Sequence, residues 1–296
     1  MNCEVLVDNA PFSFEISGQF HWGDDEVLYK EKGNIISGRP WKNRGYTQLK
    51  LLNEMDSSSL RRSIKKVLLR IFKELRIHCD DRFTLEKYHH TIRTESLHQR
   101  VIGETSRLTG GDFGFDLPKL IRKISNELEA PLEIFNPLLN EEYIILRINR
   151  PHSLDMNPPH RDGYQDVWKD TLNIWIPIAG CTPQSSLPVI PGSHLWNEKE
   201  IYRTAVQGAM INNRRYHVPG IVKTRRGRLH MIRPCPRYGE ALVFTPFLIH
   251  GAALNSQRDT TRFSLELRLF HGNALKKAGT FGLSSAKADV FQGLPD

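Results

Sequence analysis

Hydrophobic positions in the first half of the chain recur at helical spacing in two places. Between residues 56 and 78, seven apolar residues recur three and four positions apart. This predicts one buried face of an amphipathic helix, with the serines at 57–59 capping its start and the basic residues on its solvated face. A second helix is predicted over residues 117–129, with Asp116 as its N-cap and Pro118 in its first turn. Residues 79–116 indicate a loop with little regular structure.

From about residue 141 the pattern changes to short runs rich in β-branched residues, separated by proline and glycine. The runs that predict strands are 143–148, 171–178, 187–192, 241–247 and 262–270. Their spacing is typical of an antiparallel sandwich or barrel. The predicted fold class is therefore mainly β with flanking helices.

Length and composition favour an ordinary globular protein. The chain has 296 residues, of which 39% are hydrophobic and 25% charged, which is too apolar for a disordered chain. No run approaches the roughly 18 apolar residues of a membrane span. Glu4 and Asp8 interrupt the apolar stretch at the N-terminus, which is not the pattern of a signal peptide. The four cysteines are far apart, so we expect neither a zinc-cysteine site nor a disulfide framework, and a cytoplasmic location.

The positive charge is concentrated in one segment. The formal charge is +8, yet residues 203–237 carry nine basic residues and no acidic one. A charge of +8 less these nine leaves −1 for the rest of the chain. The protein is thus near neutral with one basic segment, which needs a local explanation.

Candidate chemistry begins with an H-x-D pair. His160 and Asp162 lie two residues apart, so in an extended segment both side chains point to the same face. His250 ends a strand-like run far downstream. Two histidines and one carboxylate form the facial triad that binds non-haem Fe(II) and leaves positions open for a co-substrate and dioxygen. Because the chain has 12 histidines and 33 acidic residues, a chance pair of surface residues is the alternative.

A basic residue and a hydroxyl follow the second histidine. Arg262 lies twelve residues after His250, and Ser264 shares its face of a predicted strand. A guanidinium with a hydroxyl can hold the far carboxylate of a dicarboxylic keto acid. Arg147 and Asn149, on the strand before the H-x-D pair, are further candidates for the same cavity, with a core or edge role as the alternative.

These motifs resemble, in order, the phytanoyl-CoA dioxygenase (PhyH)-like family of Fe(II)/2-oxoglutarate-dependent oxygenases. The resemblance covers about residues 141–270 and rests on H-x-D, the strand with Trp175, PGSH at 191–194, GEALVF at 239–244 and the run ending in His250-Gly251. Residues 1–130 show no such motif.

The resemblance implies a fold, a ligand set and a reaction. We expect one compact domain, with a double-stranded β-helix, or jelly roll, at 141–272, a mixed α/β segment at 1–140 whose helices pack on it, and a tail at 273–296. It implies His160, Asp162 and His250 as iron ligands, Arg262 at the far carboxylate of 2-oxoglutarate, and Trp175 along that cofactor.

The implied activity is dioxygen-dependent hydroxylation of an unactivated C–H bond, with release of succinate and CO₂. Related halogenases have a small residue in place of the carboxylate, so Asp162 favours hydroxylation or desaturation. Family members often place a hydroxyl two residues after the distal histidine, where this chain has Ala252, and Ser264 is the candidate replacement. In PGSH we expect a turn in which Ser193 or His194 supports the loop beside the metal.

The basic segment at 203–237 is interpreted as an insertion over the mouth of the site. As a lid it would attract a small anionic substrate, such as a phosphorylated or carboxylated metabolite, a natural-product intermediate, an acyl-CoA or a sugar conjugate. The substrate candidates are Arg225, Arg226, Arg228 and Tyr164. A solvated loop whose arginines contact the protein's own acids is the alternative. A second alternative is that the segment binds a polyanion, such as a glycolipid, a membrane surface or nucleic acid. No nucleic-acid-binding motif accompanies the charge. The sequence leaves the oligomeric state open.

Overall fold

The structure is a computed structural model that describes residues 1–136, 139–211 and 214–271. The tail expected at 273–296 lies outside the described residues. The helices are α1 (Glu54–Glu74), α2 (Tyr88–Thr91), α3 (Glu95–Thr105) and α4 (Leu117–Glu127). The strands of the first half are β1 (Asn2–Val7), β2 (Ala10–Glu15), β3 (Phe20–Trp22), β4 (Tyr46–Lys50), β5 (Leu132–Glu133), β6 (Phe135–Asn136) and β7 (Glu141–Glu142). Those of the second half are β8 (Ile144–Asn149), β9 (Thr171–Ala179), β10 (Ile201–Thr204), β11 (Ala209–Ile211), β12 (Arg214–Tyr216), β13 (Ile221–Thr224), β14 (Leu229–Met231), β15 (Glu240–Phe244) and β16 (Arg262–His271).

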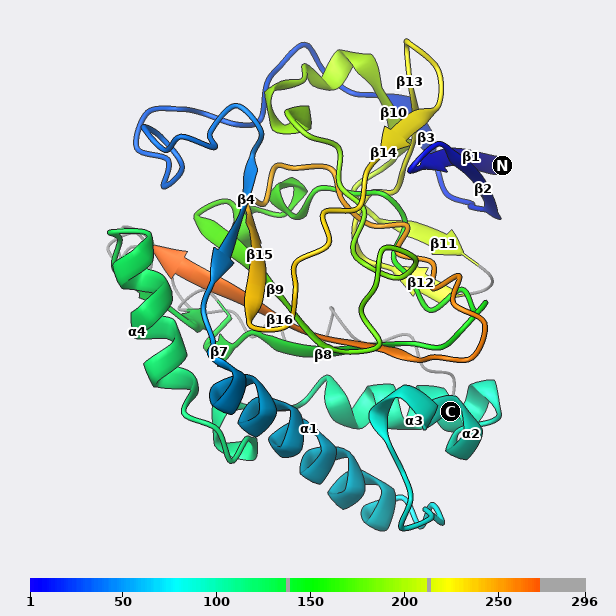
Figure 1. Ribbon diagram of the computed structural model, residues 1–296. Helices are drawn as coiled ribbons and strands as arrows, with labels where there is room; N and C mark the ends of the chain where they lie inside the picture. The colour runs from blue at the N-terminus through cyan, green and yellow to red at the C-terminus, as the bar shows by residue number, and fades with distance from the viewer. Residues whose placement is uncertain (137–138, 212–213, 272–296) are drawn as a thin grey trace.

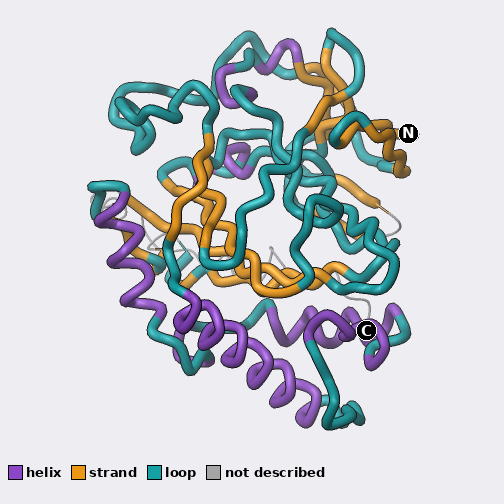
Figure 2. The backbone as a smooth tube through the Cα atoms, viewed as in Figure 1, coloured by secondary structure: helices purple, strands orange, loops and turns teal. Residues whose placement is uncertain are grey.

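The largest sheet has the order β4-β15-β9-β16-β5, and β8 also pairs with β16 (Figure 1). Side chains alternate across it. The odd-numbered residues of β16 from Phe263 to Leu269 belong to the same hydrophobic core as the buried faces of α1 and α4. The even-numbered residues from Arg262 to Arg268 take the opposite face. Helices therefore cover one face of the sheet, as Figure 2 shows. The charged residues of β16, namely Arg262, Glu266 and Arg268, line a pocket on the opposite face.

A second, irregular layer faces the polar side of this sheet. It includes isolated bridges that join His160 to His250, His250 to Val189, and Val189 to Ile232. Ile221 of β13 continues the layer by donating its N–H to the carbonyl of Pro159 at 2.7 Å. Small sheets of order β14-β1-β2 and β13-β10-β3 extend it outward. Two facing layers of antiparallel strands form the jelly roll, so the predicted fold class is confirmed.

The N-terminal strands pair with strands of both layers. β1 pairs with β14, β3 with β10 and β4 with β15, so strands from residues 1–50 complete sheets built by the second half of the chain. Figure 1 shows this as blue strands beside yellow and orange ones.

Some local predictions are confirmed and others are wrong. Asp116 caps α4 through a bond from the N–H of Lys119, as predicted. The cap of α1 is Asn53, whose side chain accepts from the N–H of Asp56, so the serines at 57–59 lie inside the helix. The expected loop at 79–116 contains α2 and α3. Helix α3 fully buries only one apolar residue, Val101, beside His98 and Thr105, and hydrophobic periodicity missed it because Leu97 and Ile102 are only partly buried.

Candidate functional site

The candidate triad comes together between the two layers. His160 and His250 are bridged partners in the irregular layer, and Asp162 begins a short 3₁₀ turn (Asp162–Tyr164) directly after His160. All three residues are buried. The Nε2 atom of His160 lies 3.4 Å from Oδ1 of Asp162, and Nε2 of His250 lies 3.6 Å from Oδ2. One ligand atom from each residue therefore converges on a single point, as a metal ion requires.

Backbone carbonyls orient both imidazoles. Nδ1 of His160 lies 2.7 Å from the carbonyl of Pro158, and Nδ1 of His250 lies 3.0 Å from the carbonyl of Leu248. A carbonyl can only accept, so Nδ1 carries the proton in each ring and Nε2 keeps a free lone pair. Burial, helped by repulsion from His160, lowers the pKa of His250 to about 4. The ring of His250 is thus presented in the neutral form that binds a metal.

Two residues hold the carboxylate of Asp162. Arg268 donates to Oδ1 at 2.5 Å, and Asn173 donates to Oδ2 at 2.6 Å. Burial would raise the pKa of Asp162, but the charge of Arg268, followed by the interactions with His250 and His160, outweighs it and holds the pKa below its ordinary value. The carboxylate is therefore ionised and fixed in orientation.

A buried ion pair next to His160 and Asp162 in the sequence stabilises the segments that carry the triad. Arg161 is fully buried and donates to Glu198 at 2.5 Å and to the carbonyl of Ser193 at 2.5 Å. The hydroxyl of Ser193 accepts the N–H of Ile249 at 2.8 Å. Ser193 belongs to the PGSH motif and therefore connects the segments that carry the two histidines, as the turn interpretation of that motif predicts.

Next to the triad, Arg262 is buried without an acidic partner. Its side chain is 2% exposed, and no salt bridge reaches it among the described residues. It donates to the hydroxyl of Ser264 at 2.5 Å, and its guanidinium carbon lies 5.6 Å from the ring centroid of Trp175. Nε of Arg262 and Nε1 of Trp175 are buried donors with no bond in the part of the chain that the structure describes. Burial lowers the pKa of Arg262. A desolvated cation with spare donors is complementary to a carboxylate.

One pocket joins these groups. It is lined by the triad, by Arg262 and Trp175, and by further polar side chains that include Arg147, Asn149, Glu266 and Arg268. The placement of Arg147 and Asn149 agrees with their candidacy for the cavity. Asn173 and Arg268 were missed by the sequence analysis, although each alternates with an identified residue on its strand. Asn173 shares a face of β9 with Trp175, and Arg268 shares a face of β16 with Arg262.

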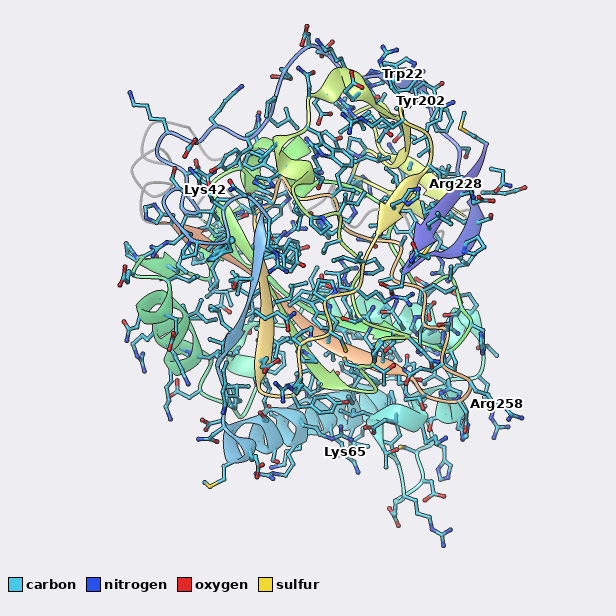
Figure 3. The ribbon with its side chains drawn as sticks, turned by 45° about the horizontal axis from the view of Figure 1, so that its top comes forward. Trp22, Lys42, Lys65, Tyr202, Arg228 and Arg258 are labelled. Atoms are coloured by element: carbon cyan, nitrogen blue, oxygen red, sulfur yellow. The ribbon has the colours of Figure 1, made fainter. Side chains whose placement is uncertain are left out.

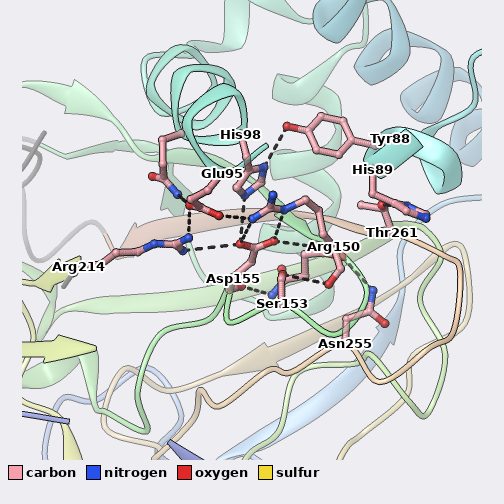
Figure 4. A network of polar contacts seen from close by, with 12 residues as sticks. Tyr88, His89, Glu95, His98, Arg150, Ser153, Asp155, Arg214, Asn255 and Thr261 are labelled. Carbon is pink, nitrogen blue, oxygen red and sulfur yellow. Dashed lines mark hydrogen bonds and ion pairs between the residues drawn. The ribbon is translucent and has the colours of Figure 1, made fainter. Parts of the chain in front are cut away.

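A polar network fixes the loop that leads from β8 to the H-x-D pair (Figure 4). Arg150 binds Asp155 with its Nε and a terminal nitrogen, both at 2.9 Å, and Glu95 of α3 at 2.5 Å. His98 lies 3.4 Å from Asp155 and 3.0 Å from the hydroxyl of Tyr88. Asp155 also lines the pocket. Helix α3 thereby holds one wall of the pocket in place.

The structure places the other substrate candidates outside the pocket lining. Arg225, Arg226 and Arg228 are exposed in the segment that joins β13 to β14, two strands of different sheets. Arg225 stacks on Trp22 at 4.5 Å and Arg228 pairs with Glu4. Figure 3 shows Trp22, Tyr202 and Arg228 on this outer part of the molecule.

Tyr164, the remaining substrate candidate, is partly buried under Arg203, whose guanidinium carbon lies 4.5 Å from the centroid of the Tyr164 ring.

Most basic residues of the segment 203–237 contact acidic residues of the same chain. Arg203 also pairs with Glu198, and Arg214 pairs with Glu95. β13 pairs with β10, which in turn pairs with β3, and none of the described residues of 203–237 lines the pocket, so the lid interpretation of this segment gains no support.

A second cluster of possible ligands lies at the surface. Nε2 of His89 and Nε2 of His90 lie 2.8 Å and 2.7 Å from Oδ1 of Asp259. Lys87 binds the other oxygen of the same carboxylate. An ammonium there already neutralises Asp259, so this cluster is a surface ion-pair group, whereas the buried triad is the candidate metal centre.

Comparison with known proteins gives a family match. The family model described as "Phytanoyl-CoA dioxygenase (PhyH)" matches residues 64–263, which adds the second half of α1 together with α2, α3 and α4 to the range that the sequence motifs cover. No curated protein sequence matches the chain significantly. There is no helix long and apolar enough to cross a membrane in the described residues.

Solved structures with a similar fold have low sequence identity to the chain. AviO1 from Streptomyces viridochromogenes Tue57 is 15% identical at a TM-score of 0.45, and the match covers 81% of this chain and 95% of that one. EctD from S. alaskensis, solved with 2-oxoglutarate and 5-hydroxyectoine, is 15% identical at 0.44 and covers 86% and 83%. The epimerase SnoN, in complex with Fe³⁺, alpha ketoglutarate and nogalamycin RO, is 15% identical at 0.41 and covers 86% and 92%.

Proposed function

The chain belongs to the phytanoyl-CoA dioxygenase family, and from this premise we propose that it is an Fe(II)- and 2-oxoglutarate-dependent dioxygenase that hydroxylates a small anionic substrate. His160, Asp162 and His250 hold the iron. The donor set supports this assignment, because imidazole and carboxylate ligands suit Fe(II) and both Nε2 lone pairs are free. Bound Fe(II), 2-oxoglutarate and O₂ together supply the oxidant for an unactivated C–H bond, with release of succinate and CO₂.

The observation that carries the proposal is the unpaired guanidinium of Arg262. A buried cation without an acidic partner is costly in free energy unless a ligand supplies the missing charge. The far carboxylate of 2-oxoglutarate supplies it, and Ser264 steers the guanidinium through its hydrogen bond at 2.5 Å. Ser264 thus replaces the hydroxyl that the family often places where this chain has Ala252. Trp175 lies beside the cofactor and offers its free indole N–H.

The residues around the triad fix the orientation of the three metal ligands. Carbonyls of Pro158 and Leu248 keep the proton on Nδ1 of each histidine, which directs Nε2 toward the metal. Asn173 and Arg268 hold Asp162 so that it does not rotate when the metal binds. A carboxylate at position 162 supports hydroxylation or desaturation, because it occupies the position that a halide would need.

Binding of a polyanion through residues 203–237 is not favoured. Within the described residues, Arg203, Arg214 and Arg228 pair with acids of the same chain. Arg233 and Arg237 likewise lie near Asp8 and Glu240. A cytoplasmic location remains a prediction from the cysteine pattern.

The test is the release of succinate from 2-oxoglutarate by the purified protein without added substrate. Slow release should require Fe(II) and O₂ together, and His160→Ala should abolish it. His230→Ala, which removes an exposed histidine of β14, is the matched control and should retain the activity. Release that persists in His160→Ala would contradict the proposed metal site.

A further inference from the structure

Beyond the triad, the inner face of the main sheet carries a row of charged residues. Arg262, Glu266 and Arg268 alternate along β16, and Arg147 lies on the neighbouring strand β8, where it pairs with Ser264 in the ladder. Arg262 is assigned above to the cofactor. Arg147, Glu266 and Arg268 line the same pocket, and none of them is assigned as a ligand of iron or 2-oxoglutarate, although Arg268 positions the ligand Asp162.

Each of these charges has a partner within the chain. Arg147 donates to Glu266 at 2.9 Å, and Arg268 donates to Asp162 at 2.5 Å. The guanidinium carbon of Arg268 lies 4.2 Å from the ring centroids of both Tyr143 and Trp168. The two rings restrict where the guanidinium can go, and only its edge is left for an acceptor.

Binding of Fe(II) and 2-oxoglutarate, which the proposed function requires, changes the balance of charges in the pocket. The charge of Fe(II) is +2, and one unit of it is offset by Asp162 and the other by the near carboxylate of 2-oxoglutarate. Arg262 offsets the far carboxylate, and Arg150 offsets Asp155. Arg147 and Glu266 offset each other. Arg268 is then the cation without a full counter-charge, although its side chain is only 11% exposed.

We propose that the substrate carries one singly charged oxyanion, such as a carboxylate, which Arg268 and Arg147 bind together. A guanidinium is planar and can donate two parallel hydrogen bonds to an oxyanion. Arg147 is accessible from the pocket, because its side chain is 31% exposed. The excess of one positive charge matches a monoanion and disfavours a neutral substrate. Because Asp162 neutralises Arg268 until the metal binds, the oxyanion binds only to the loaded protein.

Acetate and acetamide are suitable probes, since they have the same shape and differ in charge. Protein loaded with Mn(II) and saturating 2-oxoglutarate, which blocks Arg262, is titrated with each while tryptophan fluorescence is recorded. Trp168 stacks on Arg268 and should report binding. We expect saturable binding of acetate to the loaded protein and no binding of acetamide. Without the metal, we expect no binding of acetate to Arg262→Met protein, in which the other guanidinium that could take a carboxylate is removed.

Two variants should change the affinity for acetate in opposite directions. Arg147→Gln removes one charge-assisted donor and should weaken binding about tenfold to a hundredfold. Glu266→Gln frees Arg147 from its competing carboxylate and should strengthen it. Lys223→Gln, at an exposed cation on β13 outside the pocket, should leave it unchanged. A folding defect would weaken binding in both pocket variants, so opposite signs identify the site.

The same proteins separate this inference from the proposed function. Anaerobic Fe(II) and 2-oxoglutarate should give a visible absorption band with wild type and with Arg147→Gln. If the band is present but acetate binds equally well to wild type and Arg147→Gln, or equally well to Arg262→Met with and without metal, the oxyanion site is refuted and the proposed function stands. If wild type gives no band, both are refuted.

Discussion

Replacing Arg262 with methionine should produce two effects of opposite sign. The guanidinium is buried, makes one hydrogen bond to Ser264, and meets no acid among the described residues. Methionine fills a similar volume without a charge. The substitution therefore removes the anchor for 2-oxoglutarate and, in the cofactor-free protein, removes a desolvated cation that nothing neutralises.

The size of each effect follows from the burial. Removing one partner of a desolvated, hydrogen-bonded charge pair costs about 2–5 kcal/mol of binding free energy, which raises the Kd for 2-oxoglutarate about 30-fold to 4,000-fold. A buried donor without a partner costs about 1–3 kcal/mol of folding free energy. The cofactor-free variant should therefore be as stable as wild type or more stable, with a Tm up to several degrees higher.

The assay measures 2-oxoglutarate binding by calorimetry with Mn(II) present, and Tm with and without 2-oxoglutarate. Arg258→Met, at an exposed arginine labelled in Figure 3, is the control and should match wild type in both. Mn(II) affinity should stay within a few-fold in Arg262→Met, because Arg262 holds no metal ligand. An unchanged Kd for 2-oxoglutarate would show that another residue is the anchor. A large loss of stability without cofactor would refute the account of Arg262 as an unneutralised cation.

Three further predictions concern the residues around the triad. Gly251 has φ +123, and a Cβ there would lie 2.3 Å from the carbonyl oxygen of Pro158. Gly251→Ala should therefore lower the affinity for Mn(II) and cost about 2–4 kcal/mol of unfolding free energy, measured by denaturation. An unchanged Mn(II) affinity would contradict the tight packing at this position. Glu198→Gln leaves Arg161 buried without its carboxylate and should cost about 3–5 kcal/mol of unfolding free energy, whereas a cost below 1 kcal/mol would show that the pair is not needed. Burial lowers the pKa of His194 from 6.5 to about 4. The unfolded chain takes up this proton first, so stability is complete above pH 6.5 and declines by roughly 3 kcal/mol as the pH falls to about 4. His194→Gln should flatten this decline, measured on metal-free protein, and an equally steep profile would refute the assignment.

The sequence located much of the candidate site because its parts lie close together in short motifs. His160 and Asp162 share a face by strand alternation, and Arg262 and Ser264 do the same on β16, where the structure joins them by a hydrogen bond. Asn173 and Arg268 could have been found by the same alternation, since they share inner faces with Trp175 and Arg262.

The rest depended on tertiary pairing that a local pattern does not contain. Nothing in residues 221–231 indicates that β13 pairs with β10 and that β14 pairs with β1, and these pairings carry Arg225 and Arg228 away from the pocket. Helix α3 was missed because its buried face includes His98, which is held by Tyr88 and Asp155 rather than by apolar packing. From the pairing of β1, β3 and β4 with later strands, we infer that residues 1–140 and 141–272 fold as one unit.

Anaerobic titration of the protein with Fe(II) and then 2-oxoglutarate tests the central claim most directly. The account predicts a weak visible charge-transfer band that requires both additions, is lost in His160→Ala, and needs a higher concentration of 2-oxoglutarate in Arg262→Met. Wild-type protein that gives no band at saturating concentrations of both, or a band of equal strength in His160→Ala, would contradict it.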